Sequence, residues 1–210
     1  MNYTLNNSSS ATYNEKRSEF IGYSKPIKNV HDINSFVKIL KSKHPASRHI
    51  SWAYRLYIDN NIIENSTDAG EPSGSAGLPI LNMIKHHNIV NCCILVVRFF
   101  GGVKLGKRGL INAYKTTAEL VIAESVLHKW LPKSQYQITA SVKYFGKIAN
   151  IVQQNNGKII SDMTLEKLNL LIELPVDKYT DFKNEFEDNT QNSGRIKQRS
   201  EHDQTKEVRK

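Results

Sequence analysis

The sequence predicts an α+β protein built from two domains. Segments whose apolar residues recur with helical spacing are mixed along the chain with segments that alternate like strands. The stretch Trp130-Leu131-Pro132-Lys133 is typical of a linker, and it separates a longer first part from a shorter second part. The 210 residues suit one large domain or two small ones, and a hydrophobic content of 39% is enough to form buried cores.

The first domain, residues 15–130, follows a polar segment, residues 1–14, which we expect to be flexible or to form an edge. A short strand is predicted over residues 20–27. A helix is predicted after Asp32, a suitable N-cap residue, and Pro45 ends that helix.

Two further strands and two further helices are predicted in this domain. Residues 50–58 alternate clearly between two faces, as a strand requires. Residues 89–100 are almost continuously apolar, which predicts a strand covered on both faces. Helices are predicted around Pro79, whose missing N–H costs little in a first turn, and over residues 109–125.

The second domain, residues 135–199, is predicted to run strand, helix, strand, strand, helix. This order is most of a ferredoxin-like β-α-β-β-α-β unit. Its last strand is expected at residues 195–199, where only Ile196 is strongly apolar. The charged residues 200–210 are predicted to form a disordered tail.

The composition favours an anionic partner. The chain carries 29 Lys and Arg against 20 Asp and Glu, a formal charge of +9. Such a balance favours nucleic acid, although a solvated basic surface without a partner would have the same composition. Cys92 and Cys93 lack metal-ligand spacing and are typical of buried residues on opposite faces of a strand in a reducing compartment. Since no signal peptide or membrane span is visible, we expect a cytoplasmic protein.

Two glycine-rich loops hold most of the eleven glycines. They are Asp68-Ala-Gly-Glu-Pro-Ser-Gly-Ser-Ala-Gly77 and Arg98-Phe-Phe-Gly-Gly-Val-Lys-Leu-Gly-Lys-Arg-Gly109. Each leads into a predicted helix, and a loop of small residues that opens a helix exposes N–H groups suited to an anion. The candidate anion-binding residues of these loops are Ser73, Gly74, Ser75, Gly101, Gly102 and Gly106.

Cations and aromatic residues accompany the second loop. The candidate phosphate contacts are Arg98, Lys104, Lys107 and Arg108, with Arg48 and Arg55 as an extension if their strand lies nearby. Phe99 and Phe100 are suited to stack on unpaired bases. An equally open interpretation is that both rings are buried and the cations are only solvated.

The second loop nearly matches a phosphate-binding P-loop. Gly101, four residues, Gly106 and Lys107 have the required spacing between a strand and a helix. However, Arg108 stands where a Ser or Thr hydroxyl should bind Mg²⁺, and no apolar strand ends in a Walker-B aspartate. We therefore do not expect a nucleotide triphosphatase.

The first loop nearly matches a nucleophile elbow with Ser75 in the nucleophile position. Ser73 replaces its first glycine, and the polar residues 64–70 stand where an apolar strand is needed. No His or Cys spacing predicts a metal site, and no cofactor is expected. Asp68 and Glu71 are expected to cap the loop and the following helix.

Both loops resemble the signature of the YigZ/IMPACT family. The similar segments are Ser66-Thr-Asp-Ala-Gly-Glu-Pro-Ser-Gly-Ser-Ala-Gly-Leu-Pro-Ile-Leu81, Val97-Arg-Phe-Phe-Gly-Gly-Val-Lys-Leu-Gly106 and Gly109-Leu-Ile-Asn-Ala-Tyr114. His44-Pro-Ala-Ser-Arg-His49 and Trp52-Ala-Tyr-Arg55 match the segment before the signature, and Lys16-Arg-Ser-Glu-Phe-Ile21 matches the family's opening. The resemblance covers roughly residues 13–125.

The resemblance implies an N-terminal α/β sandwich of the ribosomal-protein type, like domain 2 of small-subunit protein five, with helices on one face of a sheet. It also implies a ferredoxin-like C-terminal domain and no established catalytic activity. Eukaryotic members restrain activation of an initiation-factor kinase by competing for its activator, and bacterial members are thought to bind nucleic acid or the translation machinery. With no recruitment domain ahead of the signature, this chain resembles the bacterial form.

One departure from the family pattern bears on function. The family usually has Leu-Gly-Thr-Gly-Gly-Leu where this chain has Leu105-Gly-Lys-Arg-Gly-Leu110. Lys107 and Arg108 make the loop more basic, and an arginine argues against a required positive φ at that position.

We therefore expect a non-enzymatic, translation-associated regulatory protein that binds RNA, another nucleic acid or a ribosome-associated partner through the glycine-loop face. The first alternative is an enzyme that acts on a small phosphorylated substrate at the first loop. The second is a pure protein-interaction module. The sequence leaves the oligomeric state open.

Overall fold

The computed structural model describes residues 1–58 and 61–199, so the predicted tail at residues 200–210 lies outside the described residues. The chain divides into two compact units, and the division falls between Trp130 and Leu131, inside the predicted linker. Unit 1 is the part before this division, and unit 2 is the part after it.

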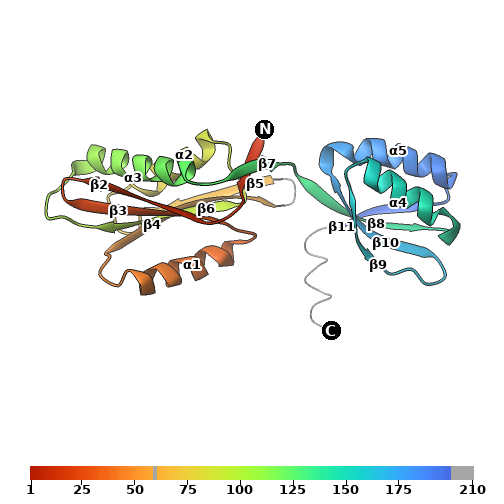
Figure 1. The fold of residues 1–210 in the computed structure, drawn as a ribbon, viewed down its shortest axis with the longest axis horizontal. Coiled ribbons are helices and arrows are strands. Elements are labelled where there is room, and N and C mark those ends of the chain that lie inside the picture. Colours follow the sequence, from red (N-terminus) through yellow and green to blue (C-terminus); the bar gives the residue numbers. More distant parts are fainter. Residues whose placement is uncertain (59–60, 200–210) are drawn as a thin grey trace. The chain divides into compact units, whose positions relative to one another are not determined.

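An antiparallel five-stranded sheet forms the centre of unit 1 (Figure 1). Its strand order is β2-β3-β6-β4-β5, so that the most apolar strand, β6, is central. A separate two-stranded sheet pairs β1 with β7. The strands are β1 Asn2–Leu5, β2 Ser9–Glu15, β3 Ser18–Pro26, β4 His49–Ile58, β5 Asn61–Thr67, β6 Cys92–Phe99 and β7 Leu127–Trp130.

Residues 1–14, predicted to be flexible or to form an edge, lie in two strands. β1 pairs with β7, and its Leu5 is only 3% exposed. β2 is the edge strand of the large sheet and pairs with β3 over its whole length. The polar composition of β2 suits an edge position, where alternate side chains face solvent. The edge position that the sequence allowed is therefore that of β2, whereas β1 pairs with a strand from the far end of the unit.

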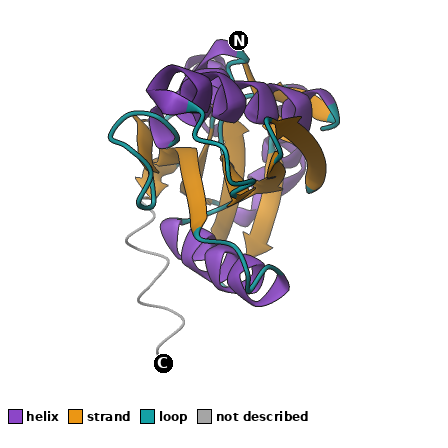
Figure 2. Cartoon of the chain, turned by 90° about the vertical axis from the view of Figure 1, so that its left-hand side faces the viewer, coloured by secondary structure: helices purple, strands orange, loops and turns teal. Residues whose placement is uncertain are grey.

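Helices cover both faces of the large sheet (Figures 1 and 2). α1 (Val30–Lys43) lies on one face, and α2 (Gly77–His86) and α3 (Gly106–Ala123) lie on the other. The sheet therefore separates two cores. The family resemblance implied helices on one face only, and α1 corrects that expectation. The continuous apolar run of β6 is the sequence signal for two covered faces, and that prediction is confirmed.

Large apolar side chains fill both cores of unit 1. The core under α1 includes Ile33, Leu40, Ile50, Leu56 and Leu95, and the core under α2 and α3 includes Phe20, Ile80, Ile84, Val96 and Tyr114. Cys92 and Cys93 are both buried, one in each core, as the alternation of a strand predicts. Neither thiol has a disulfide partner.

α1 begins with a capping box. The Asn29 side chain accepts a hydrogen bond from the Asp32 N–H, and the Asp32 carboxylate accepts one from the Asn29 N–H. Asp32, predicted as the N-cap, is instead the third helical residue, where an acid supports the start of the helix. Across the described residues, no helix is both long enough and apolar enough to cross a membrane.

Unit 2 has the ferredoxin-like arrangement that its sequence predicts. Its sheet order is β11-β8-β10-β9, and all three pairings are antiparallel. The weakly apolar last strand is present as β11, and its Ile196 packs against the core of the unit. The elements are β8 Lys133–Ala140, η1 Val142–Tyr144, α4 Phe145–Gln154, β9 Lys158–Asp162, β10 Leu168–Pro175, η2 Val176–Lys178, α5 Tyr179–Thr190 and β11 Arg195–Arg199.

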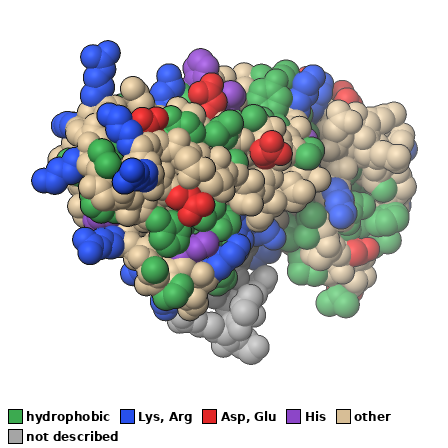
Figure 3. Space-filling model, turned by 60° about the vertical axis from the view of Figure 1, so that its left-hand side comes forward, with side chains coloured by type: hydrophobic (Ala, Val, Ile, Leu, Met, Phe, Trp, Pro, Cys, Tyr) green, Lys and Arg blue, Asp and Glu red, His purple; other side chains and the backbone are tan. Residues whose placement is uncertain are grey.

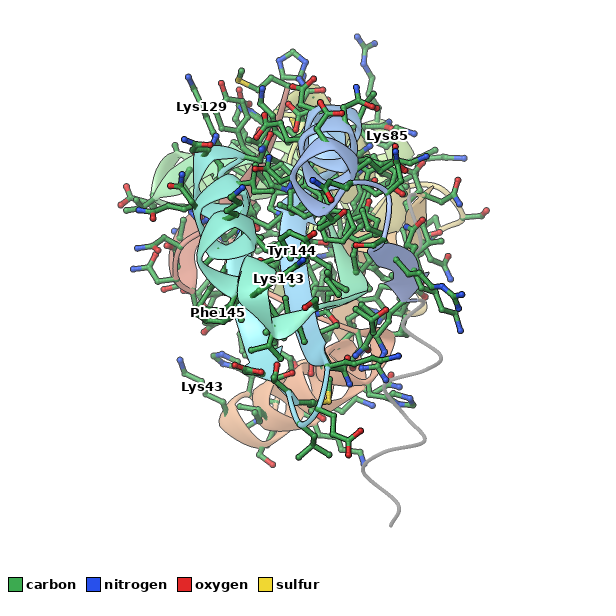
Figure 4. The ribbon with its side chains drawn as sticks, turned by 90° about the vertical axis from the view of Figure 1, so that its right-hand side faces the viewer. Lys43, Lys85, Lys129, Lys143, Tyr144 and Phe145 are labelled. Carbon is green, nitrogen blue, oxygen red and sulfur yellow. The ribbon has the colours of Figure 1, made fainter. Side chains whose placement is uncertain are left out.

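The start of α4 presents a small cluster of side chains. Lys143, Tyr144 and Phe145 are labelled there in Figure 4. The Lys143 Nζ lies 4.9 Å from the centroid of the Tyr144 ring. Phe145 is 41% exposed, whereas Tyr144 is partly buried and packs against the core of unit 2.

The capping box makes one substitution on α1 specifically costly. Asn29→Ala removes the acceptor for the Asp32 N–H, so we expect the free energy of unfolding of unit 1 to fall by about 1 kcal/mol. Asn34→Ala, on the exposed side of the same helix, is the matched control and should change it by less than about 0.5 kcal/mol. Urea unfolding followed by circular dichroism measures both, and equal losses would contradict the capping role of Asn29.

Candidate nucleic-acid interface

Both glycine loops lie at one end of the unit 1 sheet. The strand register is the reason, because Phe99 at the end of β6 pairs with Glu19 near the start of β3, and Arg98 pairs with His49 at the start of β4. The loop end, as we name it, consists of residues 16–17, 44–48, 68–76 and 100–108. Figure 3 brings this end of unit 1 forward and shows Lys and Arg side chains around it.

The first glycine loop binds an anion, and that anion is the protein's own Asp68 carboxylate. Its Oδ1 accepts hydrogen bonds from the N–H groups of Ala76 and Gly77, both at 2.9 Å. Its Oδ2 accepts one from the Gly74 N–H at 2.8 Å. The predicted capping role of Asp68 is therefore confirmed. The predicted anion-binding role of Gly74 is corrected, since its amide is already occupied.

The ionisation of Asp68 reflects these contacts. Burial alone would raise the pKa of Asp68. The three N–H donors and the nearby Lys107 ammonium outweigh burial and hold the pKa of Asp68 below its usual value. Lys107 belongs to the first turn of α3, at the end of the second glycine loop.

The second glycine loop contains one position where only glycine fits. A Cβ added to Gly101 would lie 2.0 Å from the carbonyl carbon of Arg17. The Gly101 N–H donates to Ser18 Oγ at 3.1 Å, which ties this loop to the β2–β3 turn. Gly102 and Gly106 have φ values of +85° and +71°, a region that suits glycine. These glycines shape the loop.

The start of α3 differs from the start of α2. No described side chain caps α3, and its first turn carries Lys107 and Arg108 without an acid. Its free N–H groups and two cations therefore make this helix start electropositive. The helix begins at Gly106, before the predicted start at residue 109. Arg108 lies inside the helix, which agrees with the expectation that its position needs no positive φ.

Arg98 is a buried structural cation, which corrects its predicted role as a phosphate contact. It is 7% exposed, and its Nη1 lies 2.8 and 2.9 Å from the two carboxylate oxygens of Glu71. The Tyr114 hydroxyl donates to Glu71 Oε1 at 2.8 Å. Glu71, predicted to cap the loop, thus joins the first loop to β6 and α3. The guanidinium of Arg98 also lies over the rings of Phe20 and Phe100.

Two other residues that were predicted to contact an anion are not part of the exposed surface of the loop end. Ser75 is fully buried, and its hydroxyl donates to the Pro72 carbonyl at 2.6 Å, which corrects its expected anion contact. Arg55 lies toward the opposite end of β4 and donates to the Glu64 carboxylate and the Ile89 carbonyl. Alternation along a strand shows which residues share a face but not which end of the strand meets a loop.

The remaining predicted cations lie exposed at the loop end. They are Arg48, Lys104, Lys107 and Arg108. Ser73 is exposed beside them. The structure adds Lys16 and Arg17, which are exposed in the β2–β3 turn. Sequence reasoning missed these two because their place beside the second loop depends on the pairing of β3 with β6.

The fold and the loop end define a two-unit α+β protein with a basic surface formed by glycine loops. The Impact N-terminal domain family matches residues 16–122, which is just over half of the chain, so the chain belongs to the IMPACT family. This confirms the resemblance that the loop motifs indicated.

Two bacterial relatives illustrate the extent of the similarity. IMPACT family member YvyE of Bacillus subtilis strain 168 is 32% identical over 141 residues, 67% of this chain and 64% of that protein. The match therefore spans slightly less than two thirds of the length of that relative. IMPACT family member YigZ of Escherichia coli strain K12 is 28% identical over 169 residues, 80% of this chain and 82% of that protein.

A solved structure shows the same fold. The crystal structure of a protein described as hypothetical matches with a TM-score of 0.69 and 24% identity, over 95% of this chain and 97% of that one. At this level of identity the likeness concerns the fold alone.

The Arg98–Glu71 pair makes the loop end sensitive to one change of charge. Glu71→Gln leaves the buried Arg98 guanidinium without a countercharge, so we expect the free energy of unfolding to fall by about 3–5 kcal/mol. Glu64→Gln breaks the more exposed pairs of Glu64 with Lys85 and Arg55 and should cost about 1 kcal/mol or less. Urea unfolding of both variants provides the comparison. Similar losses of unfolding free energy would show that the buried pair stabilises the protein no more than the exposed pairs do.

Asp68 should make unit 1 less stable in acid. Because its pKa is lowered in the folded state, its ionised form contributes stability that is fully present above the unfolded pKa, about 4, and is lost as pH falls through the folded pKa. Wild type should therefore be more stable than Asp68→Asn at neutral pH, and the difference should shrink below about pH 4.

A series of urea titrations from neutral to acid pH measures this difference. Glu119→Gln, which removes an exposed acid from α3, is the control and should follow wild type more closely. A difference between wild type and Asp68→Asn that stays constant across the acid range would contradict the role of the Asp68 carboxylate.

Proposed function

We propose that this IMPACT family protein is a non-enzymatic, translation-associated regulator that binds single-stranded RNA through the loop end. The observation that carries the proposal is the gathering of exposed cations from three loops and one helix start. These cations are Lys16, Arg17, Arg48, Lys104, Lys107 and Arg108. Among the described residues, none of the six forms a salt bridge.

The chemistry of this surface suits a phosphate backbone. Lys and Arg side chains supply most of the affinity of proteins for nucleic acid. The uncapped start of α3 adds N–H groups of the same electrostatic sign beside Lys107 and Arg108. Phe100 is 49% exposed next to these cations, and an exposed aromatic ring can stack on an unpaired base. An unpaired strand is therefore a better fit than a duplex.

The translation-associated part of the proposal rests on family membership. The family resemblance implies translational control, and RNA or a ribosome-associated partner is the kind of polyanion that this role requires. The proposal places the protein in the cytoplasm, where translation takes place.

The enzyme alternative needs reactive groups at the first loop, and the groups there have structural partners. Ser75 is buried against Pro72, Asp68 is bound by three amides, and Arg98 is paired with Glu71. Within the described residues, no group of three His, Cys, Asp or Glu side chains lies close enough to hold a metal ion. These contacts favour the binding proposal over catalysis on a phosphorylated substrate.

The proposal predicts how two matched double variants bind RNA. Lys107→Ala with Arg108→Ala should weaken binding and reduce the slope of log affinity against log salt by about 1.4, since each phosphate contact contributes about 0.7 for single strands. Lys115→Ala with Lys129→Ala removes the same charge from exposed positions outside the loop end and should leave the slope near wild type. Lys129 is labelled in Figure 4.

Fluorescence anisotropy with a labelled single-stranded RNA, repeated at several salt concentrations, makes this measurement. Equal effects of the two double variants would show that net charge, and not the loop end, governs binding. A partner that co-purifies after nuclease treatment, together with no measurable RNA affinity, would instead favour a protein-interaction module.

A further inference from the structure

A cleft of about 550 Å³ opens at the loop end, between the C-terminal half of α1 and the start of β4. Its lining comes from α1, from the residues that connect α1 to β4, from the start of β4 and from the first glycine loop. The side chains that matter for its chemistry are Lys41, His44, Ser47, Arg48 and Trp52, with Ala69 of the first glycine loop on its wall.

The charged lining of this cleft is of one sign. Lys41 and Arg48 are both exposed, and among the described residues that line the cleft none is Asp or Glu. Asp68, next to Ala69 in the chain, is turned toward the amides of the first loop. Burial and the Lys43 ammonium lower the pKa of His44, so this ring is neutral at physiological pH. An anion in the cleft would therefore meet two cations and no opposing carboxylate.

An aromatic wall faces the same space. Trp52 lies on the α1 side of β4, partly exposed, and its ring stacks on Tyr54 with a centroid distance of 5.9 Å and an interplanar angle of 28°. This support holds the indole in place and leaves it available to the cleft. A fixed indole is a suitable platform for a planar base.

The polar walls are also fixed before any ligand arrives. His44 Nε2 lies 2.7 Å from the Tyr23 hydroxyl, and the Ser47 hydroxyl donates to the His44 carbonyl at 2.8 Å. His49 Nδ1 lies 2.8 Å from the Ala69 carbonyl oxygen and joins β4 to the first loop. A site that is already ordered loses little entropy on binding.

We infer that the α1–β4 cleft binds one nucleotide, with the base against Trp52 and the phosphate on Lys41 and Arg48. The volume lies within the range of about 300–1,000 Å³ typical of small-molecule sites. A purely apolar ligand would leave the two cations without a partner. The nucleotide is either free or the unpaired end of an RNA strand bound at the loop end, and the second source rests on the proposed function.

Two tryptophans occur in the chain, so Trp130→Phe leaves Trp52 as the only indole and its fluorescence as a local probe. Adenosine 5′-monophosphate should quench this fluorescence, whereas adenosine alone and inorganic phosphate should bind about tenfold more weakly or not at all. In the same background, Lys41→Ala and Arg48→Ala should each weaken binding of the monophosphate about tenfold. Lys38→Ala, an exposed change on α1 outside the cleft, is the matched control and should bind like its parent.

A 5′-phosphorylated single-stranded RNA tetranucleotide distinguishes the two sources. Tighter binding of the tetranucleotide than of the monophosphate supports the end of an RNA strand, and the reverse supports a free nucleotide. No quenching by either ligand, or equal affinity in parent, Lys41→Ala and Arg48→Ala, would overturn the inference.

The outcome can be separated from the test of the proposed function. If RNA binding depends on Lys107 and Arg108 but neither ligand quenches the Trp52 fluorescence, the proposed function is supported and nucleotide binding in the cleft is rejected. If the monophosphate quenches this fluorescence but the protein has no affinity for RNA, the nucleotide site in the cleft is supported and the proposed function is rejected.

Discussion

The Glu71 carboxylate is the contact on which the arrangement of the loop end depends. It joins the first glycine loop to β6 through Arg98 and to α3 through Tyr114. A buried guanidinium is tolerated only with its countercharge, so docking of β6 and α3 requires the first loop to bring Glu71 inward. The Asp68 carboxylate then fixes the turn within that loop. These two acids thus join the first loop to β6, to α3 and to the start of α2.

This use of acids determines the sign of the surface. Asp68 and Glu71 both lie within the first glycine loop, yet their oxygens are directed at backbone amides, at Arg98 and at Tyr114. The cations of the neighbouring turns therefore face solvent without these carboxylates among them. The exposed charged side chains of the loop end are therefore all cations, and the α1–β4 cleft has the same character.

Local patterns in the sequence predicted much of the fold. The alternation of β4, the continuous apolar run of β6 and the element order of unit 2 were sufficient, because each depends on neighbouring residues. The glycine loops were recognised for the same reason. The sequence could not predict a role that depends on a partner far away in the chain. The strand β1 forms by pairing with β7, and Arg98 is buried because it pairs with Glu71. Lys16 and Arg17 lie beside the second loop only because β3 pairs with β6.

The adjacent cysteines of the central strand β6 can report which helices have separated from the sheet. Burial raises the pKa of the Cys93 thiol to about 12 and raises that of Cys92 as well, so neither forms the reactive thiolate while β6 stays covered. Their side chains enter opposite cores. A thiol reagent that reaches Cys93 alone would therefore record loss of α1 from the sheet, whereas modification of Cys92 alone would record loss of α2 and α3.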